Sequence, residues 1–136
     1  MCSHPRKAQT SVEFVFLVGA MLIMFLLFSI MVQNQMLTAV ERANQAKLRE
    51  IENLIKSEFD IAFAASPGYS RVFEIPTILD GLNYSVELFE DQEIILTMQH
   101  EELVGFIPYN ITGTLGEGKN VIWKNSTGGL FVNGTS

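Results

Sequence analysis

The sequence predicts an α+β protein, in which a long N-terminal helix is followed by a small antiparallel β-sandwich or barrel. Residues 14–32 form an uncharged run in which sixteen of nineteen positions carry a large apolar side chain. Residues 33–65 contain neither proline nor glycine, and their apolar residues recur every three or four positions, as on one face of a helix. From residue 69 onward, β-branched and aromatic residues are interspersed with glycine, asparagine and aspartate, which is typical of short strands and turns.

The apolar run is long enough to cross a membrane. At about 1.5 Å per residue, a helix over 14–32 spans roughly 28 Å, close to the ~30 Å thickness of the hydrocarbon core. Arg6 and Lys7 precede the run without a neighbouring acid, whereas the first charges after it balance each other. This asymmetry predicts that residues 1–8 lie in the cytoplasm and that the chain beyond the run lies outside the cell.

A secretory signal peptide is a rival interpretation of the run. The apolar core of such a peptide has about 7–15 residues and ends at a small-residue cleavage site. The run is longer than that, and the sequence SIMVQNQ at its end offers no such site. A plain signal anchor is still compatible with the sequence.

The helix is expected to continue from about Thr10 to Ala65, where Pro67 and Gly68 stop it. Its second half carries an apolar stripe on one face, which would serve docking of the β domain within the monomer, packing between subunits, or both. The stripe consists of Leu37, Val40, Leu48, Ile51, Ile55, Phe59 and Ala62.

The β region is expected to contain six or seven short strands, with Trp123 and the Phe and Tyr residues in its core. One hairpin is predicted to turn at Glu90–Asp91 and a second at the sequence STGG. The predicted strands cover 69–76, 83–90, 92–99, 102–108, 109–115, 120–125 and 129–134.

Charge and composition exclude several classes of function. The formal net charge is −6, and residues 66–136 carry three cations against nine acids, so the distal region repels nucleic-acid phosphates. Cys2 is the only cysteine and there are two histidines, which gives no disulfide framework and no evident zinc or thiol chemistry. We expect no metal site, no cofactor and no catalytic residues, and therefore not an enzyme.

The N-terminal sequence RKAQTSVEFVFL carries a specific motif. It resembles the class III signal peptide of archaeal type IV pilins, whose euryarchaeal form reads Q-x-S-x-E-x-x-x-L. Lys7 and Ala8 stand where that family has a basic and a small residue before its cleavage site, although many members have glycine in place of Ala8. The S-x-E arrangement favours an adhesion-type pilin over an archaellin. The four fixed positions are filled by Gln9, Ser11, Glu13 and Leu17.

The resemblance implies a route of maturation and assembly. A prepilin peptidase would recognise Lys7, Ala8 and Gln9 and cut between the last two. An assembly ATPase and a membrane platform would then transfer the subunit from the membrane into a filament of other pilin subunits. Glu13, the fifth residue of the mature chain, would meet the N-terminal amine of a neighbouring subunit. The implied parts are a leader at 1–8, a helix at 9–66 with 14–32 as membrane span and filament core, and an extracellular β domain at 67–136.

One alternative is a protein that is anchored in the membrane by the same segment but does not polymerise into a filament. A single-pass surface protein with a β binding module, or a minor pilin-like subunit, would have the same membrane segment without forming a homopolymer. A filament subunit should begin at Gln9, whereas such an anchored protein should retain Met1.

Four N-x-S/T sequons lie in the distal region and predict N-linked glycans. All are on the side of the apolar run that is predicted to be external, and they include four of the eight asparagines of the chain. Two of them flank a predicted turn and are expected to be accessible, while the first is expected to begin a strand and to be less so. The sites, in order, are Asn83, Asn110, Asn125 and Asn133, of which the last two flank the turn.

Overall fold

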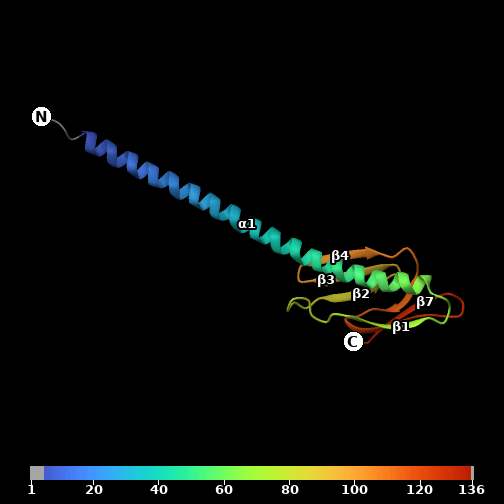
Figure 1. The fold of residues 1–136 in the computed structure, drawn as a ribbon. Coiled ribbons are helices and arrows are strands. Elements are labelled where there is room, and N and C mark those ends of the chain that lie inside the picture. The colour runs from blue at the N-terminus through green and yellow to red at the C-terminus, as the bar shows by residue number, and fades with distance from the viewer. Residues whose placement is uncertain (1–4, 136) are drawn as a thin grey trace. The chain divides into compact units, whose positions relative to one another are not determined.

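A computed structural model describes residues 5–135 and confirms the α+β class (Figure 1). The described chain begins with a helix, α1, at Pro5–Ala64 and continues with seven strands. The strands are β1 at Ser70–Ile75, β2 at Ser85–Phe89, β3 at Glu93–Met98, β4 at Glu101–Phe106, β5 at Ile111–Thr114, β6 at Gly118–Lys124 and β7 at Leu130–Thr135.

Helix α1 begins five residues earlier than the predicted start at Thr10. Proline is favoured in the first turn of a helix, where its missing N–H has no partner to lose, and the residues after Pro5 are good helix formers. Residues 1–4 of the predicted leader lie outside the described residues. The chain divides into two compact units, Met1–Val40 and Glu41–Ser136, so that α1 contributes to both.

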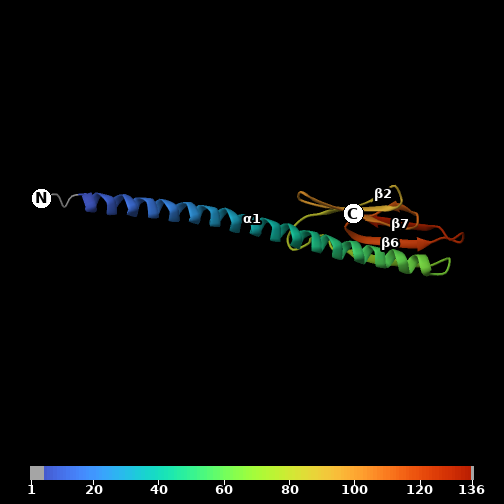
Figure 2. The same ribbon diagram turned by 90° about the horizontal axis from the view of Figure 1, so that it is seen from above.

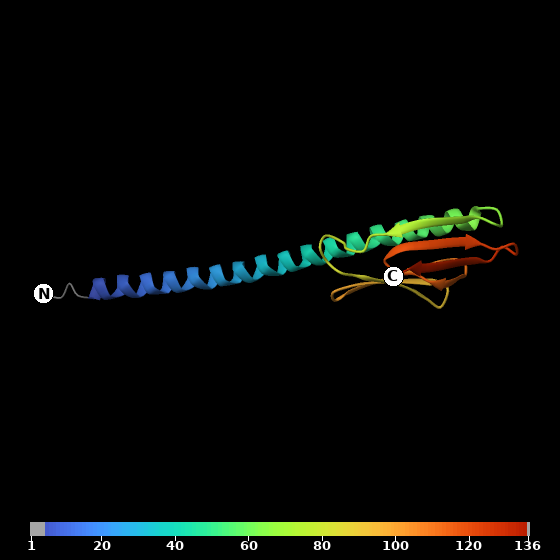
Figure 3. The ribbon, with the colours of Figure 1, turned by 90° about the horizontal axis from the view of Figure 1, so that it is seen from below.

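The strands of the second unit form two sheets, seen from above and below in Figures 2 and 3. A four-stranded sheet has the order β1-β6-β7-β5, and a three-stranded sheet has the order β2-β3-β4. Both predicted hairpins, β2–β3 and β6–β7, are present and antiparallel. The pairing of β5 with β7 is parallel, in contrast to the expected antiparallel arrangement.

The parallel pairing arises because β7 lies between two strands that are consecutive in sequence. Residues 115–117 alone join β5 to β6, yet β7 returns into the space between them. The fully buried Asn120 holds this connection, because its Nδ2 donates to the carbonyls of Gly116 (2.8 Å) and Gly118 (3.1 Å), and its Oδ1 accepts from the Gly116 N–H (3.2 Å). A Cβ on Gly134 in β7 would lie 2.6 Å from the Gly116 nitrogen, so this close approach requires glycine.

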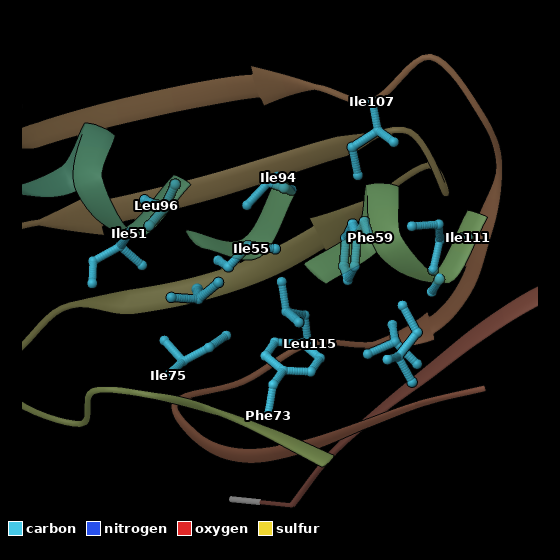
Figure 4. Packing of buried hydrophobic residues seen from close by; sticks show 14 of the residues in the cluster. Ile51, Ile55, Phe59, Phe73, Ile75, Ile94, Leu96, Ile107, Ile111 and Leu115 are labelled. Carbon is cyan, nitrogen blue, oxygen red and sulfur yellow. The ribbon is translucent and has the colours of Figure 1, made fainter. Parts of the chain in front are cut away.

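The core of the second unit lies where the second half of α1 meets both sheets (Figure 4). Ile55 and Phe59 of α1 are fully buried, as are Ile75 of the four-stranded sheet and Leu96 of the three-stranded sheet. Each such side chain contributes about 1.5–3 kcal/mol by leaving water. The apolar stripe therefore docks the β domain within the monomer from Leu48 onward. Its first two predicted members, Leu37 and Val40, lie in the first unit and are exposed.

Not all aromatic residues of the β region lie in this core. Phe73 is buried as expected and meets Phe59 edge to face at 6.3 Å. Trp123, by contrast, follows the fully buried Ile122 in β6, and since successive strand residues face opposite sides, it points outward and is 36% exposed. Phe106 is exposed in the same way, on β4. The expectation that these two side chains belong to the core was wrong.

Lys124 is a structural residue that the sequence analysis did not single out. Helix α1 has no basic residue in its last turn. Lys124, from the end of β6, supplies one: its Nζ donates to the carbonyls of Phe63 (2.7 Å) and Ala65 (2.9 Å), and it lies 5.6 Å from the centre of the Phe63 ring. A cation from the sheet thereby satisfies carbonyls that every helix leaves unpaired at its C-terminus.

Candidate functional site

The first candidate site is the surface of α1 in the unit Met1–Val40. All sixteen large apolar side chains between residues 14 and 32 are exposed, from 38% at Val32 to 80% at Phe16. By length and composition, α1 can cross a membrane, and it is the only such helix among residues 5–135. An apolar surface this large needs a cover of lipid or of other apolar protein surfaces.

The four motif residues all lie on α1 and are exposed, but they do not share one face. Gln9, Glu13 and Leu17 are spaced by four, so their side chains project from the same side of the helix. Ser11 is two residues from Gln9 and from Glu13, so it projects from roughly the opposite side. The glutamate is therefore in line with the residue that would carry the new amine after cleavage.

Glu13 stands at the start of the apolar surface. It lines a shallow hollow of the helix surface together with the apolar residues Val12, Phe16, Leu17 and Ala20. It forms no ion pair with another described residue. A carboxylate that is covered by apolar groups costs several kcal/mol unless it is paired. Covering this surface would therefore favour a positive or hydrogen-bonding partner for Glu13, or its protonation.

The predicted cleavage position lies in the first turns of α1. Arg6 and Lys7 are the only Arg or Lys residues before residue 41, and both are exposed there together with Ala8. The bond between Ala8 and Gln9 thus follows directly on the charged end of the helix. The ends of helices fray more readily than their interiors, which suits a bond that a peptidase must reach.

Two hydroxyl groups in and just after the apolar run are satisfied within the helix. Ser29 Oγ donates to the carbonyl of Phe25 at 2.8 Å, inside the apolar run. Thr38 Oγ1 makes the same kind of bond, to the carbonyl of Asn34 at 2.9 Å. Because these donors have partners one turn earlier, they need no water when the helix is covered.

The sequons form the second set of candidate sites, and two of them are in loops. Asn83 lies two residues before β2, outside any strand, and is exposed, so the expectation that it is less accessible was wrong. Asn110 directly precedes β5 and is also exposed. Its Oδ1 accepts from Gln92 Nε2 at 2.6 Å.

The other two sequons lie on β7 and in the turn before it. Asn125 is half-buried, and its Oδ1 accepts from the N–H and the hydroxyl of Thr127 (3.1 and 2.8 Å) and from the Gly129 N–H (2.6 Å). Asn133 is exposed within β7, and its Oδ1 lies 3.4 Å from Thr114 Oγ1. Among the described residues, neither amide nitrogen donates a hydrogen bond, so both Nδ2 atoms are available for modification.

Residues 5–135 hold no group of three or more His, Cys, Asp or Glu side chains placed to bind a metal ion. Tyr109 is the most perturbed tyrosine: burial and the bond that it donates to Asp60 Oδ1 (2.5 Å) raise its pKa. Its ring stacks on Phe63 at 4.4 Å, so its role is to fasten the end of α1 to the sheets.

The chain has a pilin-like architecture, with an exposed apolar N-terminal helix followed by a small β-sheet domain. Comparison with protein-family models, curated proteins and solved structures finds no match to it.

Proposed function

We propose that the protein is the structural subunit of an archaeal type IV pilus-like surface filament that serves adhesion. The observation that carries the proposal is the uncovered apolar surface of α1 between residues 14 and 32, directly behind the Q-x-S-x-E-x-x-x-L motif. In the membrane, lipid covers this surface; in the filament, the helices of other subunits would cover it. The surface then never meets water, and close packing between helices drives assembly.

Cleavage would prepare the helix for this transfer. A prepilin peptidase hydrolyses the bond between Ala8 and Gln9, which leaves a carboxylate on Ala8 and a new amine on Gln9. The side-chain charge of the sequence would fall from −6 to −8, because Arg6 and Lys7 would leave with the leader. Those two cations hold the precursor at the cytoplasmic face. Their loss would free the helix for the assembly ATPase and the membrane platform.

Glu13 would set the position of each new subunit relative to its neighbours in the filament. Its carboxylate lies at the start of the apolar surface and has no ion-pair partner among the described residues. The amine of Gln9 on a neighbouring subunit would neutralise it once both are buried in the filament. A correctly staggered neighbour would thereby be favoured over a misplaced one, which would leave both charges unpaired.

The four sequons would carry N-linked glycans on the outside of the cell. Asn83, Asn110 and Asn133 are exposed, and the amide nitrogen of the half-buried Asn125 is free of hydrogen bonds within the described chain. Glycans would add hydrophilic bulk to the distal domain.

The proposal is tested by mass analysis of filaments sheared from the cells that produce the protein. A filament subunit should begin at Gln9 and be abundant in the sheared fraction. Recovery only from membranes, as single molecules that retain Met1, would instead show the non-polymerising anchored protein.

The role of Glu13 is tested separately with Glu13→Ala, using Glu41→Ala as the matched control because Glu41 is also an exposed helical acid. We expect Glu13→Ala to be cleaved normally but to yield few or no filaments, and Glu41→Ala to do both normally. Normal filaments from Glu13→Ala would contradict the pairing with the N-terminal amine.

A further inference from the structure

A stacked pair of aromatic rings lies on the outer face of the four-stranded sheet. Trp123 of β6 is directly opposite Phe131 of β7, and their rings stack with centroids 5.7 Å apart and an angle of 15° between the planes. Val121 and Val72 lie in the neighbouring row of the same face, opposite each other on β6 and β1. Val72 is 60% exposed. The pair is thus the centre of a partly exposed apolar patch on this face of the sheet.

Two sequons flank this aromatic pair. Asn125 follows Trp123 by two residues, and Asn133 follows Phe131 by two residues. Because β6 and β7 run antiparallel with Trp123 opposite Phe131, the two asparagines lie at opposite ends of the stack. At the corresponding position before Asn83 and Asn110, the chain has glycine and proline, so this arrangement belongs to only two of the four sequons.

Both asparagine side chains lie within reach of the rings. The amide of Asn125 and the edge of the Phe131 ring both lie next to Gly129. A Cβ added to Gly129 would be 3.3 Å from the amide atoms of Asn125 and also 3.3 Å from Cε2 of Phe131. Residues two apart on a strand face the same side, so Asn133 shares the outer face with Phe131. It also lies directly opposite Val121.

The chemistry of this face suits a sugar. Its two central rows carry no charged side chain, and each sugar ring has an apolar C–H face that packs on aromatic rings while its hydroxyl groups stay in water. The two rows consist of Ser70, Trp123, Phe131 and Thr112, and of Val72, Val121, Asn133 and Thr114. The next row of this face is charged, because it pairs Glu74 with Lys119. On the outer face of the three-stranded sheet, by contrast, every row carries a glutamate: Glu87, Glu93 or Glu102.

We propose that Trp123 and Phe131 form a carbohydrate platform against which the first sugars of glycans on Asn125 and Asn133 pack. The inference rests on the glycosylation part of the proposed function. In the modification, Nδ2 of the asparagine bonds to the anomeric carbon of a lipid-phosphate-linked sugar. The bond from that carbon to the phosphate oxygen breaks, the lipid phosphate leaves with the bonding electrons, and the amide nitrogen loses one proton. The glycans then cover the patch and stabilise the sheet.

The test uses the full-length glycosylated protein, with the glycan positions mapped by mass spectrometry. Trp123 is the only tryptophan, so acrylamide quenching of its fluorescence reports on the platform alone. We expect glycans on Asn125 and Asn133, and stronger quenching in the variant Thr127→Ala/Thr135→Ala, which removes both sequons but leaves Asn125 Oδ1 its bonds from the N–H groups of Thr127 and Gly129. The matched control Asn83→Gln/Asn110→Gln should quench like the wild type. Bare Asn125 and Asn133, or equal quenching in both double variants, would overturn the platform.

A second variant separates sugar packing from simple shielding. Removing the two glycans should lower the thermal midpoint by about 4–8 °C, the shift that loss of one aromatic contact produces in a domain of this size. In a Phe131→Leu background the same removal should have little effect, whereas in a Phe106→Leu background it should have the full effect. Equal effects in both backgrounds would overturn the proposal. Neither result alters whether the protein forms filaments that begin at Gln9, so the two proposals fail independently.

Discussion

At the scale of single residues, the loops of the β domain are held by buried polar side chains. Tyr84 is 7% exposed, and its hydroxyl donates to the carbonyl of Pro76. Burial raises the pKa of this hydroxyl to about 12, with a smaller contribution from the negative charge of Glu117. The protonated form is the one that both burial and the hydrogen bond favour.

This shift predicts a loss of stability at alkaline pH. The folded-state pKa of Tyr84 is above the ordinary tyrosine value of about 10, so its contribution is complete below pH 10 and is lost as the pH rises toward 12. Tyr109, whose pKa is also raised, acts in the same direction. Denaturant unfolding between pH 8 and 12 should show a decline that Tyr84→Phe/Tyr109→Phe largely removes. An equally steep decline in the double variant would assign it to other groups.

Asn120 should be the most costly asparagine to replace. Asn120→Ala leaves the N–H and carbonyl of Gly116 and the carbonyl of Gly118 buried without these partners. We expect the free energy of unfolding to fall by about 1–3 kcal/mol. Asn53→Ala, on the exposed side of α1, should change it by less than about 0.5 kcal/mol. Chemical denaturation of both variants measures the difference, and equal losses would contradict the role of Asn120.

Local spacing along the sequence determines which residues share one side of a helix. Gln9, Glu13 and Leu17 fall on one side of α1 because four residues make about one helical turn. Trp123 was misplaced because its size suggested the core, although alternation along β6 allows only one of Ile122 and Trp123 to point inward. Asn120 could not be found, because its partners belong to a connection whose shape depends on β7.

At the scale of elements, α1 and the sheets are joined through the C-terminal end of the helix. Lys124 binds two carbonyls there, next to the stacked rings of Phe63 and Tyr109. Pro67 and Gly68 predict an end of the helix at about Ala65, and the helix ends at Ala64. The cation that completes this end comes from β6, about sixty residues later in the sequence, which is why helix-stop signals alone did not reveal it.

Loss of this cation should destabilise the second unit. Lys124→Met keeps most of the side-chain length but removes two charge-assisted hydrogen bonds and the contact with the Phe63 ring, and we expect a loss of about 1.5–3 kcal/mol. Lys56→Met is the matched control, because Lys56 only pairs with Glu52 one turn away, a pair worth about 0.2–0.5 kcal/mol. Thermal unfolding compares them; a similar shift for both would refute the capping role.

Among the strands, too, features that depend on nearby residues were predictable, whereas those that depend on residues far apart in the sequence were not. Alternation and turn residues predicted both hairpins, because each depends on fewer than twenty consecutive residues. The parallel pairing of β5 with β7 depends on which of several edges the last strand joins. Local patterns do not encode that choice, and the contacts made there by Asn120 and Gly134 with residues 115–117 exist only once β7 is in place.

At the scale of the whole molecule, the two units differ in whether their apolar side chains are buried or exposed. Every member of the buried core belongs to Glu41–Ser136, beginning with Leu48. The unit Met1–Val40 exposes its apolar side chains instead. At about 1.5–3 kcal/mol for each of the sixteen large side chains in residues 14–32, exposing them to water costs roughly 25–50 kcal/mol, several times the stability of a typical domain.

This contrast predicts that the second unit folds without the first. A fragment of residues 41–136 retains all core residues and both sheets and loses only the surface that needs a cover, so it should be soluble, monomeric and cooperatively unfolding in water. The full chain should require detergent, lipid or a filament. Light scattering and thermal unfolding of the fragment beside the full chain, each with and without detergent, measure this. A fragment that aggregates or melts without a transition would mean that the core depends on residues before Glu41.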